Sequence, residues 1–153
     1  MDLRVELVPA ESTLPLRQRV LRPHQRVEDV VVPGEREPGA AHVAALTGDG
    51  AVVATAVLVR EPFAGAPDRT DVWRLRGMAT ADSLRGQGVG GRVMRYALGQ
   101  VALHGGGLVW ASVRVPARRF YEREGFAGVG DVWTDPATGP HVTMWREVRV
   151  PED

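Results

Sequence analysis

The segment Arg85-Gly86-Gln87-Gly88-Val89-Gly90 combines an arginine with three glycines directly before the strongest helical pattern of the chain. Glycines leave backbone N–H groups unobstructed, and at a helix N-terminus the helix dipole also favours negative charge. Arg85 would add a fixed positive charge at the rim of such a site. We interpret this glycine loop (Arg85–Gly90) as a binding site for a pyrophosphate rather than as a merely flexible turn.

Two other phosphate-binding motifs fit the same residues less well. Gly86, Gly88 and Gly91 have the spacing of a dinucleotide-binding fingerprint, but five residues separate the preceding strand from the first glycine. The acidic residue that this fingerprint needs about twenty positions later is also missing. A mononucleotide P-loop is excluded, because the loop has no Gly-Lys-Ser/Thr. A nucleotide-binding oxidoreductase fragment therefore remains the weaker alternative.

The composition is that of an ordinary globular protein, with 44% hydrophobic and 25% charged residues. We expect one domain over residues 1–153. Nineteen basic and nineteen acidic residues balance, so no bulk field favours nucleic acid or an anionic membrane as a partner. The chain has no cysteine, and we expect no metal site.

Without a signal peptide or a bilayer-length apolar run, the sequence predicts a cytoplasmic protein. All basic residues are arginine, and isoleucine and asparagine are absent, which suggests a GC-rich bacterial source.

Hydrophobic periodicity places the glycine loop between a strand and a helix. Apolar residues at every fourth position from Val89 to Val101 predict a helix over Val89–His104. A shorter helix is expected over Pro116–Glu124. The predicted strands are Leu3–Val8, His42–Leu46, Ala51–Arg60, Asp71–Thr80, Leu108–Val113, Phe126–Trp133 and His141–Val148. The fold class predicted from this order is a mixed α/β domain.

The remaining segments connect these elements. Ser12 or Thr13 is expected to cap a first helix, which Pro23 stops. His24–Ala40, rich in proline, glycine and acidic residues, is predicted to be a long irregular loop, and loops of this length are often functional. The four residues Thr47–Gly50 are typical of a hairpin turn.

Two motifs in the predicted order resemble the GNAT superfamily of acetyl-CoA-dependent acyltransferases. The glycine loop is similar to the Gln/Arg-x-x-Gly-x-Gly/Ala loop of the family. About thirty residues later, Phe120-Tyr121-Glu122-Arg123-Glu124-Gly125-Phe126 is similar to its aromatic–Tyr-Glu-x-x-Gly-Phe segment. More weakly, the segments Leu16–Pro23 and Gly139–Met144 resemble the small ElaA-like branch.

The resemblance implies a mixed, mostly antiparallel seven-stranded sheet whose fourth and fifth strands splay apart and are flanked by helices. The cofactor would be acetyl-CoA, with its pyrophosphate on the backbone of the glycine loop. Backbone groups of Met78, Ala79 and Thr80 would bind the pantetheine arm, and the Met78 N–H could polarise the thioester carbonyl. The acyl group would pass directly to an amine, with no covalent enzyme intermediate.

Tyr121 matches the residue that usually donates a proton to the departing CoA thiolate in this family. The alternative is a packing role beside Phe120 and Phe126. Because a thiol is already a fair leaving group, with a pKa of about 8.5, the catalytic contribution of this acid can be modest.

The residue that deprotonates the acceptor amine is harder to assign. Many members of the family carry a glutamate on the fourth strand, but here that strand carries Arg74 and Arg76. We choose His141 as the base, since a neutral imidazole can accept a proton at physiological pH. The other candidates are His42, Glu28, Asp29 and Asp131. The last alternative is an acceptor of low pKa that needs no base.

The sequence therefore predicts an N-acetyltransferase that acts on a small-molecule or peptide amine, with a homodimer left open. The rival from another class is a catalytically silent acyl-CoA-binding module. The presence of Tyr121 argues against this rival.

Overall fold

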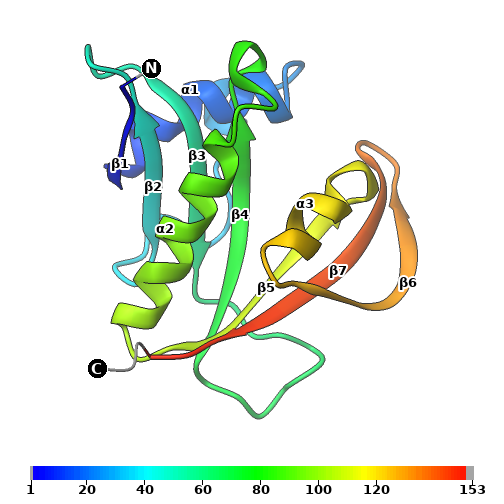
Figure 1. The fold of residues 1–153 in the computed structure, drawn as a ribbon. Coiled ribbons are helices and arrows are strands. Elements are labelled where there is room, and N and C mark those ends of the chain that lie inside the picture. The colour runs from blue at the N-terminus through cyan, green and yellow to red at the C-terminus, as the bar shows by residue number, and fades with distance from the viewer. Residues whose placement is uncertain (1, 151–153) are drawn as a thin grey trace.

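Seven strands form one sheet in the computed structural model, which describes residues 2–150 (Figure 1). The strands are β1 (Arg4–Leu7), β2 (Ala41–Leu46), β3 (Val52–Val59), β4 (Val72–Thr80), β5 (Gly107–Arg114), β6 (Ala127–Asp135) and β7 (Gly139–Val148). Their spatial order is β1-β2-β3-β4-β5-β7-β6, and every neighbouring pair is antiparallel except the parallel pair β4–β5. This is the mixed, mostly antiparallel sheet that the family resemblance implies.

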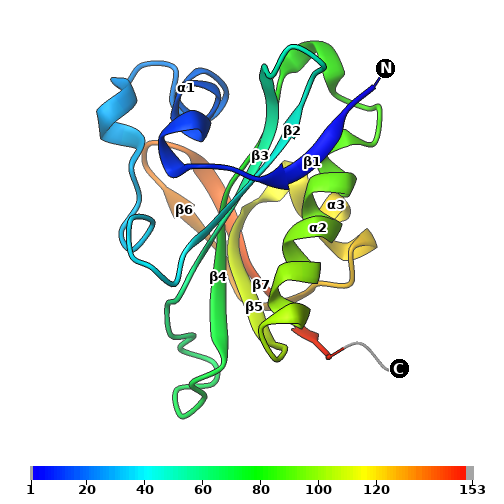
Figure 2. The same cartoon turned by 90° about the vertical axis from the view of Figure 1, so that its left-hand side faces the viewer.

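Helices cover both faces of the sheet (Figure 2). The helix α1 (Ala10–Leu21) packs on one face against β3 and β4, and α2 (Val89–Leu103) packs on the other against β2, β3 and β4. The short helix α3 (Arg118–Arg123) lies on the same side as α2. No helix within residues 2–150 has the length and hydropathy needed to span a membrane.

The helix α2 forms as its periodicity predicts. Val89, Val93, Ala97 and Val101 are all buried against the sheet. At its C-terminal end the N–H of Gly106 donates to the carbonyl of Val101, at 2.9 Å. The left-handed backbone that closes this turn, with a φ of 76° at Gly106, suits glycine.

The start of α1 differs from the prediction. The helix begins at Ala10, so Ser12 and Thr13 lie inside its first turn and neither caps it. The Ser12 hydroxyl donates to the Pro9 carbonyl at 2.7 Å, and the Thr13 hydroxyl donates to the Ala10 carbonyl at 2.8 Å. Both hydroxyls donate to carbonyls at the start of the helix. Neither accepts a hydrogen bond from the free N–H groups there, as a capping side chain would.

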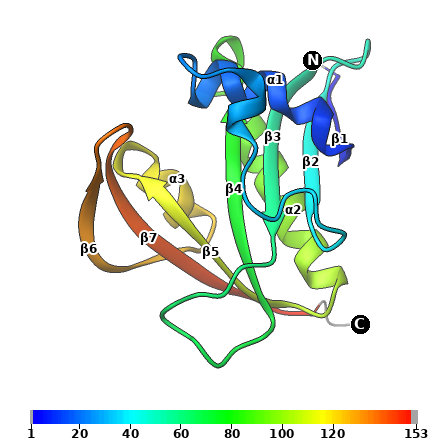
Figure 3. The same ribbon diagram turned by 180° about the vertical axis from the view of Figure 1, so that it is seen from behind.

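The predicted loop His24–Ala40 is more ordered than its composition indicates. It contains the 3₁₀ turn η1 (Val27–Val30), and Glu35 in its middle is buried. Seen from behind, this segment and α1 lie together over one face of the sheet (Figure 3). The segment is fixed by the ion pair between Arg17 and Glu35, which sequence periodicity cannot reveal.

The strands β4 and β5 separate after a short paired region, as predicted for the fourth and fifth strands. They are in register only from Val72 with Leu108 to Arg74 with Trp110. Beyond Arg74, β5 continues beside β7 while β4 continues beside β3. The gap between the diverging strands opens toward the end of β4 that leads into the glycine loop.

Candidate active site

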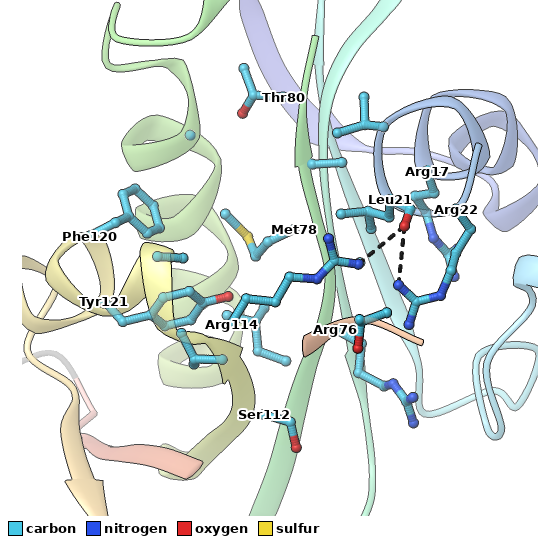
Figure 4. Close-up of a pocket in the computed structure, with 18 of the residues that line it drawn as sticks. Arg17, Leu21, Arg22, Arg76, Met78, Thr80, Ser112, Arg114, Phe120 and Tyr121 are labelled. Carbon is cyan, nitrogen blue, oxygen red and sulfur yellow. Dashed lines mark hydrogen bonds between the residues drawn. The ribbon is translucent and has the colours of Figure 1, made fainter. Parts of the chain in front are cut away.

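A cleft of about 1110 Å³ lies between the diverging strands β4 and β5. The end of α1 and residues 29–33 bound one side of it, and the glycine loop with α3 bounds the other (Figure 4). Most of the predicted site residues line this one cleft: Met78, Ala79, Thr80, Arg85, Gly86, Gly88, Val89, Gly90, Tyr121 and His141. Gln87 does not line it, because its side chain turns back to donate to the Ser83 carbonyl at 3.3 Å.

The glycine loop presents free backbone donors at the start of α2. Within residues 2–150, the N–H groups of residues 86–91 have no hydrogen-bond acceptor, whereas the N–H of Arg92 donates to the Gly88 carbonyl at 3.2 Å. Gly86 and Gly88 have φ angles of 79° and 80°, and a Cβ atom built on either would meet no atom within 4 Å. Successive N–H groups at a helix N-terminus, with open space before them, suit a pyrophosphate.

A bulge in β4 gives Met78 its position. Thr55 pairs with Ala79 and Val57 pairs with Arg76, so two residues of β4, Gly77 and Met78, stand opposite one residue of β3. Gly77 takes the left-handed conformation, with φ of 61°, which suits glycine at such a bulge. Because β5 has already diverged, Met78 has no register partner in β5 either. Its backbone is therefore available to a ligand in the cleft.

Tyr121 occupies the wall of the cleft opposite α1. Its ring packs edge-to-face with Phe120 and Phe126, at centroid separations of 5.5 and 5.3 Å. Its hydroxyl points into the cleft on the side of Met78 (Figure 4) and forms no hydrogen bond with any described residue. Burial raises the pKa of Tyr121 above its ordinary value, so the phenol keeps its proton and can donate it.

His141 lines the cleft from β7. Its ring stacks on Trp133, with centroids 4.6 Å apart, and its Nδ1 lies 2.8 Å from the Gly139 carbonyl. Since a carbonyl only accepts, Nδ1 carries the hydrogen of the neutral ring and Nε2 keeps its lone pair. Thr138 Oγ1 lies 3.4 Å from this Nε2. The geometry suits a proton acceptor.

The other candidate bases lie outside the cleft or are already paired. His42 is buried outside the cleft, where its Nε2 lies 3.1 Å from a carboxylate oxygen of Glu35. Glu28 and Asp131 are exposed and do not line the cleft. Asp29 does line the cleft, but its carboxylate is paired with Arg26 at 3.1 Å.

The fourth strand carries an arginine network instead of an acid. Arg74 donates to Glu61 at 2.5 Å and to the Ser112 hydroxyl at 3.2 Å, and its guanidinium lies 4.4 Å from the Trp110 ring. Glu61 comes from the loop after β3, so its neutralising role is not visible in the strand pattern. The period-two alternation of β4 could have indicated that Arg74 and Arg76 share one face.

Sequence reasoning missed the residues that close the cleft on the side of α1. Arg22, Arg76 and Arg114 all line it. They come from the end of α1, from β4 and from the end of β5, so only the tertiary structure brings them together.

The chain is similar to known proteins along most of its length. The model of the acetyltransferase (GNAT) family matches residues 10–126. The uncharacterized N-acetyltransferase YitI of Bacillus subtilis (strain 168) is 29% identical over 149 residues, which cover 96% of this chain and 97% of YitI.

Solved structures share the fold over nearly the whole chain. Escherichia coli ElaA has a TM-score of 0.69 at 22% identity, covering 95% of this chain and 99% of ElaA. An aminoglycoside 6'-N-acetyltransferase complexed with coenzyme A has a TM-score of 0.73 at 17% identity, covering 98% of this chain and 99% of its own. With the family model matching most of its length, and with a splayed sheet and a free glycine loop, this chain belongs to the acetyltransferase (GNAT) family.

Proposed function

We propose that this protein transfers the acetyl group of acetyl-CoA directly to the amine of a small or peptide acceptor, both substrates being bound together. Membership of the family assigns acyl transfer to the chain and acetyl-CoA as the donor. The observation that carries the finer proposal is that one cleft joins the free N–H groups of residues 86 and 88–91, the backbone at Met78 and the Tyr121 hydroxyl. We treat residues 1–153 as one catalytic unit.

Different residues of the cleft would bind different parts of acetyl-CoA. The N–H groups of the glycine loop would hold the pyrophosphate, and the backbone of Met78 to Thr80, which has no register partner in β5, would bind the pantetheine arm beside β4. The Met78 N–H would donate to the thioester oxygen as negative charge develops there. Bound acetyl-CoA supplies an activated acyl carbon.

Tyr121 would donate its proton to the leaving sulfur. Its hydroxyl is free of competing partners within residues 2–150, and burial keeps it protonated. His141, whose Nε2 keeps its lone pair and lies 3.4 Å from the Thr138 hydroxyl, would accept the proton that the acceptor amine loses. The two residues are contributed by separate elements, α3 and β7, which lets one group serve the donor and the other the acceptor.

The rival function is an acyl-CoA-binding module without activity. A module would need the glycine loop, but it would not need a free, protonated phenol in the cleft. The distinguishing measurement follows CoA release with a thiol reagent and acetylated product by mass spectrometry, across a panel of amines, beside calorimetric binding of acetyl-CoA. We expect binding together with amine-dependent CoA release. Binding without acetylation of any amine would establish the module instead.

A further inference from the structure

Three arginines from separate elements meet on the side of the cleft formed by α1, which we call the acceptor side. They are Arg22 just after α1, Arg76 on β4 and Arg114 at the end of β5, and all three are half-buried and line the cleft (Figure 4). The glycine loop and α3 lie across the cleft from Arg22 and Arg76, and the side chain of Arg114 reaches from β5 to the Leu21 carbonyl on the α1 side.

Arg22 and Arg114 are held side by side by one acceptor. The Nη1 of Arg22 and the Nη2 of Arg114 each donate to the Leu21 carbonyl at 3.1 Å. Within residues 2–150 neither guanidinium forms a salt bridge with a carboxylate. Two cations that converge on one neutral oxygen keep most of their hydrogen-bonding capacity and all of their charge.

Arg76 adds a third positive charge that is only weakly neutralised. Its nearest carboxylate oxygen belongs to Glu61 at 4.0 Å, whereas Glu61 lies 2.5 Å from Arg74. Burial lowers the pKa of Arg76, and the charge of Arg74 lowers it further, against the opposing charge of Glu61. Burial and the charge of Arg22 likewise lower the pKa of Arg114.

The acidic groups near the cleft do not cancel these charges. Asp29 is paired with Arg26, and Glu35 is paired with the buried Arg17. Asp135 also lines the cleft and favours the charged form of Arg114, while its Oδ1 accepts from the N–H groups of residues 137 and 138 at 2.7 and 3.1 Å, so its single negative charge offsets at most one of the three positive charges. The acceptor side therefore keeps an excess of positive charge in a partly desolvated space, an arrangement that a bound anion would stabilise.

We propose that the acceptor is an amine that carries its own anionic group, a carboxylate or a phosphoryl group, bound by Arg22, Arg76 and Arg114. This inference rests on the proposed acetyl transfer and names the class of its acceptor. Guanidinium groups present paired N–H donors that match the oxygens of such anions. His141 stands directly opposite Arg114 in the β5–β7 register, so the anion would be bound beside the proton acceptor.

The same charges bear on the chemistry of the amine. Positive charges close to an ammonium favour its neutral form and lower its pKa. This effect would supply reactive amine in a cleft whose fourth strand has arginines where the family often has a glutamate. It would also disfavour acceptors that carry several positive charges.

The anion could instead belong to the donor, since CoA also has phosphates. The acceptor-side arginines and the glycine loop lie on opposite sides of the cleft, so the two anion sites predict different variant effects. Calorimetry with acetyl-CoA on Arg22→Gln, Arg76→Gln and Arg114→Gln should give dissociation constants within about twofold of the wild type. A tenfold weakening, about 1.4 kcal/mol, would assign the arginines to the donor and overturn the proposal.

The direct test compares kcat/KM for pairs of amines that differ only in the anion. Each amino carboxylate and amino phosphonate is paired with the matching neutral carboxamide, and the ratio within a pair is compared between wild type and variants. This comparison cancels the intrinsic reactivity of each amine. Arg114→Gln and Arg22→Gln should lose about tenfold or more on the anionic member (about 1.4 kcal/mol) and less than about twofold on the carboxamide. Arg19→Gln, at an exposed position of α1, is the matched control and should change neither.

Comparing kcat/KM between the amino carboxylates and the amino phosphonates shows which anion is preferred. If Arg114→Gln fails to fold, Arg22→Gln still tests the proposal, because among residues 2–150 the Arg22 side chain donates a hydrogen bond only to the Leu21 carbonyl. A wild-type enzyme that prefers the carboxamides, or variants that lose both members of a pair equally, would contradict the proposal while acetyl transfer stands. Bound acetyl-CoA with no acetylation of any amine would instead contradict the proposed function.

Discussion

Arg17 and Glu35 form a two-point ion pair in the interior, with the guanidinium nitrogens 2.7 and 2.8 Å from the carboxylate oxygens. The side chains are 2% and 1% exposed. Arg17 also donates to the Val30 carbonyl at 3.1 Å, and Glu35 also accepts from the Val32 N–H at 2.6 Å. A Cβ atom on Gly77 would lie 3.0 Å from Arg17 Nε. The pair thus connects α1 to the segment His24–Ala40 and packs against the bulge of β4.

Breaking this pair should cost much of the stability of the protein. Arg17→Met leaves the Glu35 carboxylate buried without its partner, and such a loss typically costs about 3–5 kcal/mol. The control is Arg36→Met, since Arg36 pairs with Glu11 at the surface and should contribute less than about 1 kcal/mol. Urea denaturation of both variants measures the difference. Equal, small losses in the two variants would show that the buried pair is not a main support of the fold.

Glu35 should also make stability depend on pH in the acidic range. Burial raises its pKa, but hydrogen bonds from Arg17 and Val32 outweigh burial and lower the pKa from 4.5 to about 2. Between these values the unfolded chain binds more protons at residue 35 than the folded chain, so the contribution of Glu35 to the free energy of unfolding rises with pH and levels off above 4.5. The contribution is on the order of 3 kcal/mol.

Denaturation of wild type and Glu35→Gln across pH 2 to 8 measures this dependence. The slope between pH 2 and 4.5 should shrink in the variant, and an unchanged slope would assign it to other carboxylates. Burial also lowers the pKa of His42 below 6.5. Because the folded chain resists this protonation, stability should fall as the pH drops below that value.

Gly88→Asp should weaken acetyl-CoA binding by about tenfold or more, equivalent to about 1.4 kcal/mol. A carboxylate there would enter the open space before the free N–H groups and repel a pyrophosphate. Gly50→Asp is the matched control, because Gly50 has a φ of 86° and equally open surroundings in the β2–β3 turn. The two changes impose the same kind of backbone strain. Equal calorimetric affinities in the two folded variants would remove the glycine loop from the donor site.

Tyr121→Phe should lower kcat by about 10²-fold, the low end of the range for a general acid, with acetyl-CoA affinity within about twofold. The ring contacts with Phe120 and Phe126 remain in this variant, so folding should be preserved. Tyr96→Phe is the control, since Tyr96 packs against the core outside the cleft. Because burial raises the pKa of Tyr121, its loss should lower the rate throughout pH 6 to 9. A variant that turns over at the wild-type rate across this range would make the hydroxyl structural.

His141→Ala should impair acetyl transfer and alter the acidic limb of kcat/KM against pH, without changing acetyl-CoA affinity. The imidazole must be neutral to accept the proton of the amine. The profile is measured with two acceptors of different pKa, and the exposed His24→Ala serves as control. If the acidic limb shifts with the pKa of the acceptor and is the same in wild type and His141→Ala, the acceptor needs no base from the enzyme.

The glycine loop and the helix after it could be predicted from the sequence because their determinants are local. The determinants lie in or next to one helix: three glycines precede it, apolar residues recur every four positions from Val89 to Val101, and Gly105-Gly106-Gly107 end it. The placement of Tyr121 could also be predicted, since its motif is contained in one short segment. By contrast, the predicted start of α1 was wrong. The hydroxyls of Ser12 and Thr13 can donate to a carbonyl of the preceding turn as readily as they can accept at a helix cap.

Only the tertiary structure decided which charges meet. Glu35 appeared as one acid among several in a loop, and its burial depends on Arg17, eighteen positions earlier. The arginines Arg22, Arg76 and Arg114 lie far apart in the chain and converge only where β5 leaves β4 and passes the end of α1. Coulomb interactions act through space and through the burial of each group, and neither separation nor burial is written in the spacing of residues. The sequence by itself therefore predicted the glycine loop and the helix that follows it, and the packing of distant elements decided which charges meet on the acceptor side.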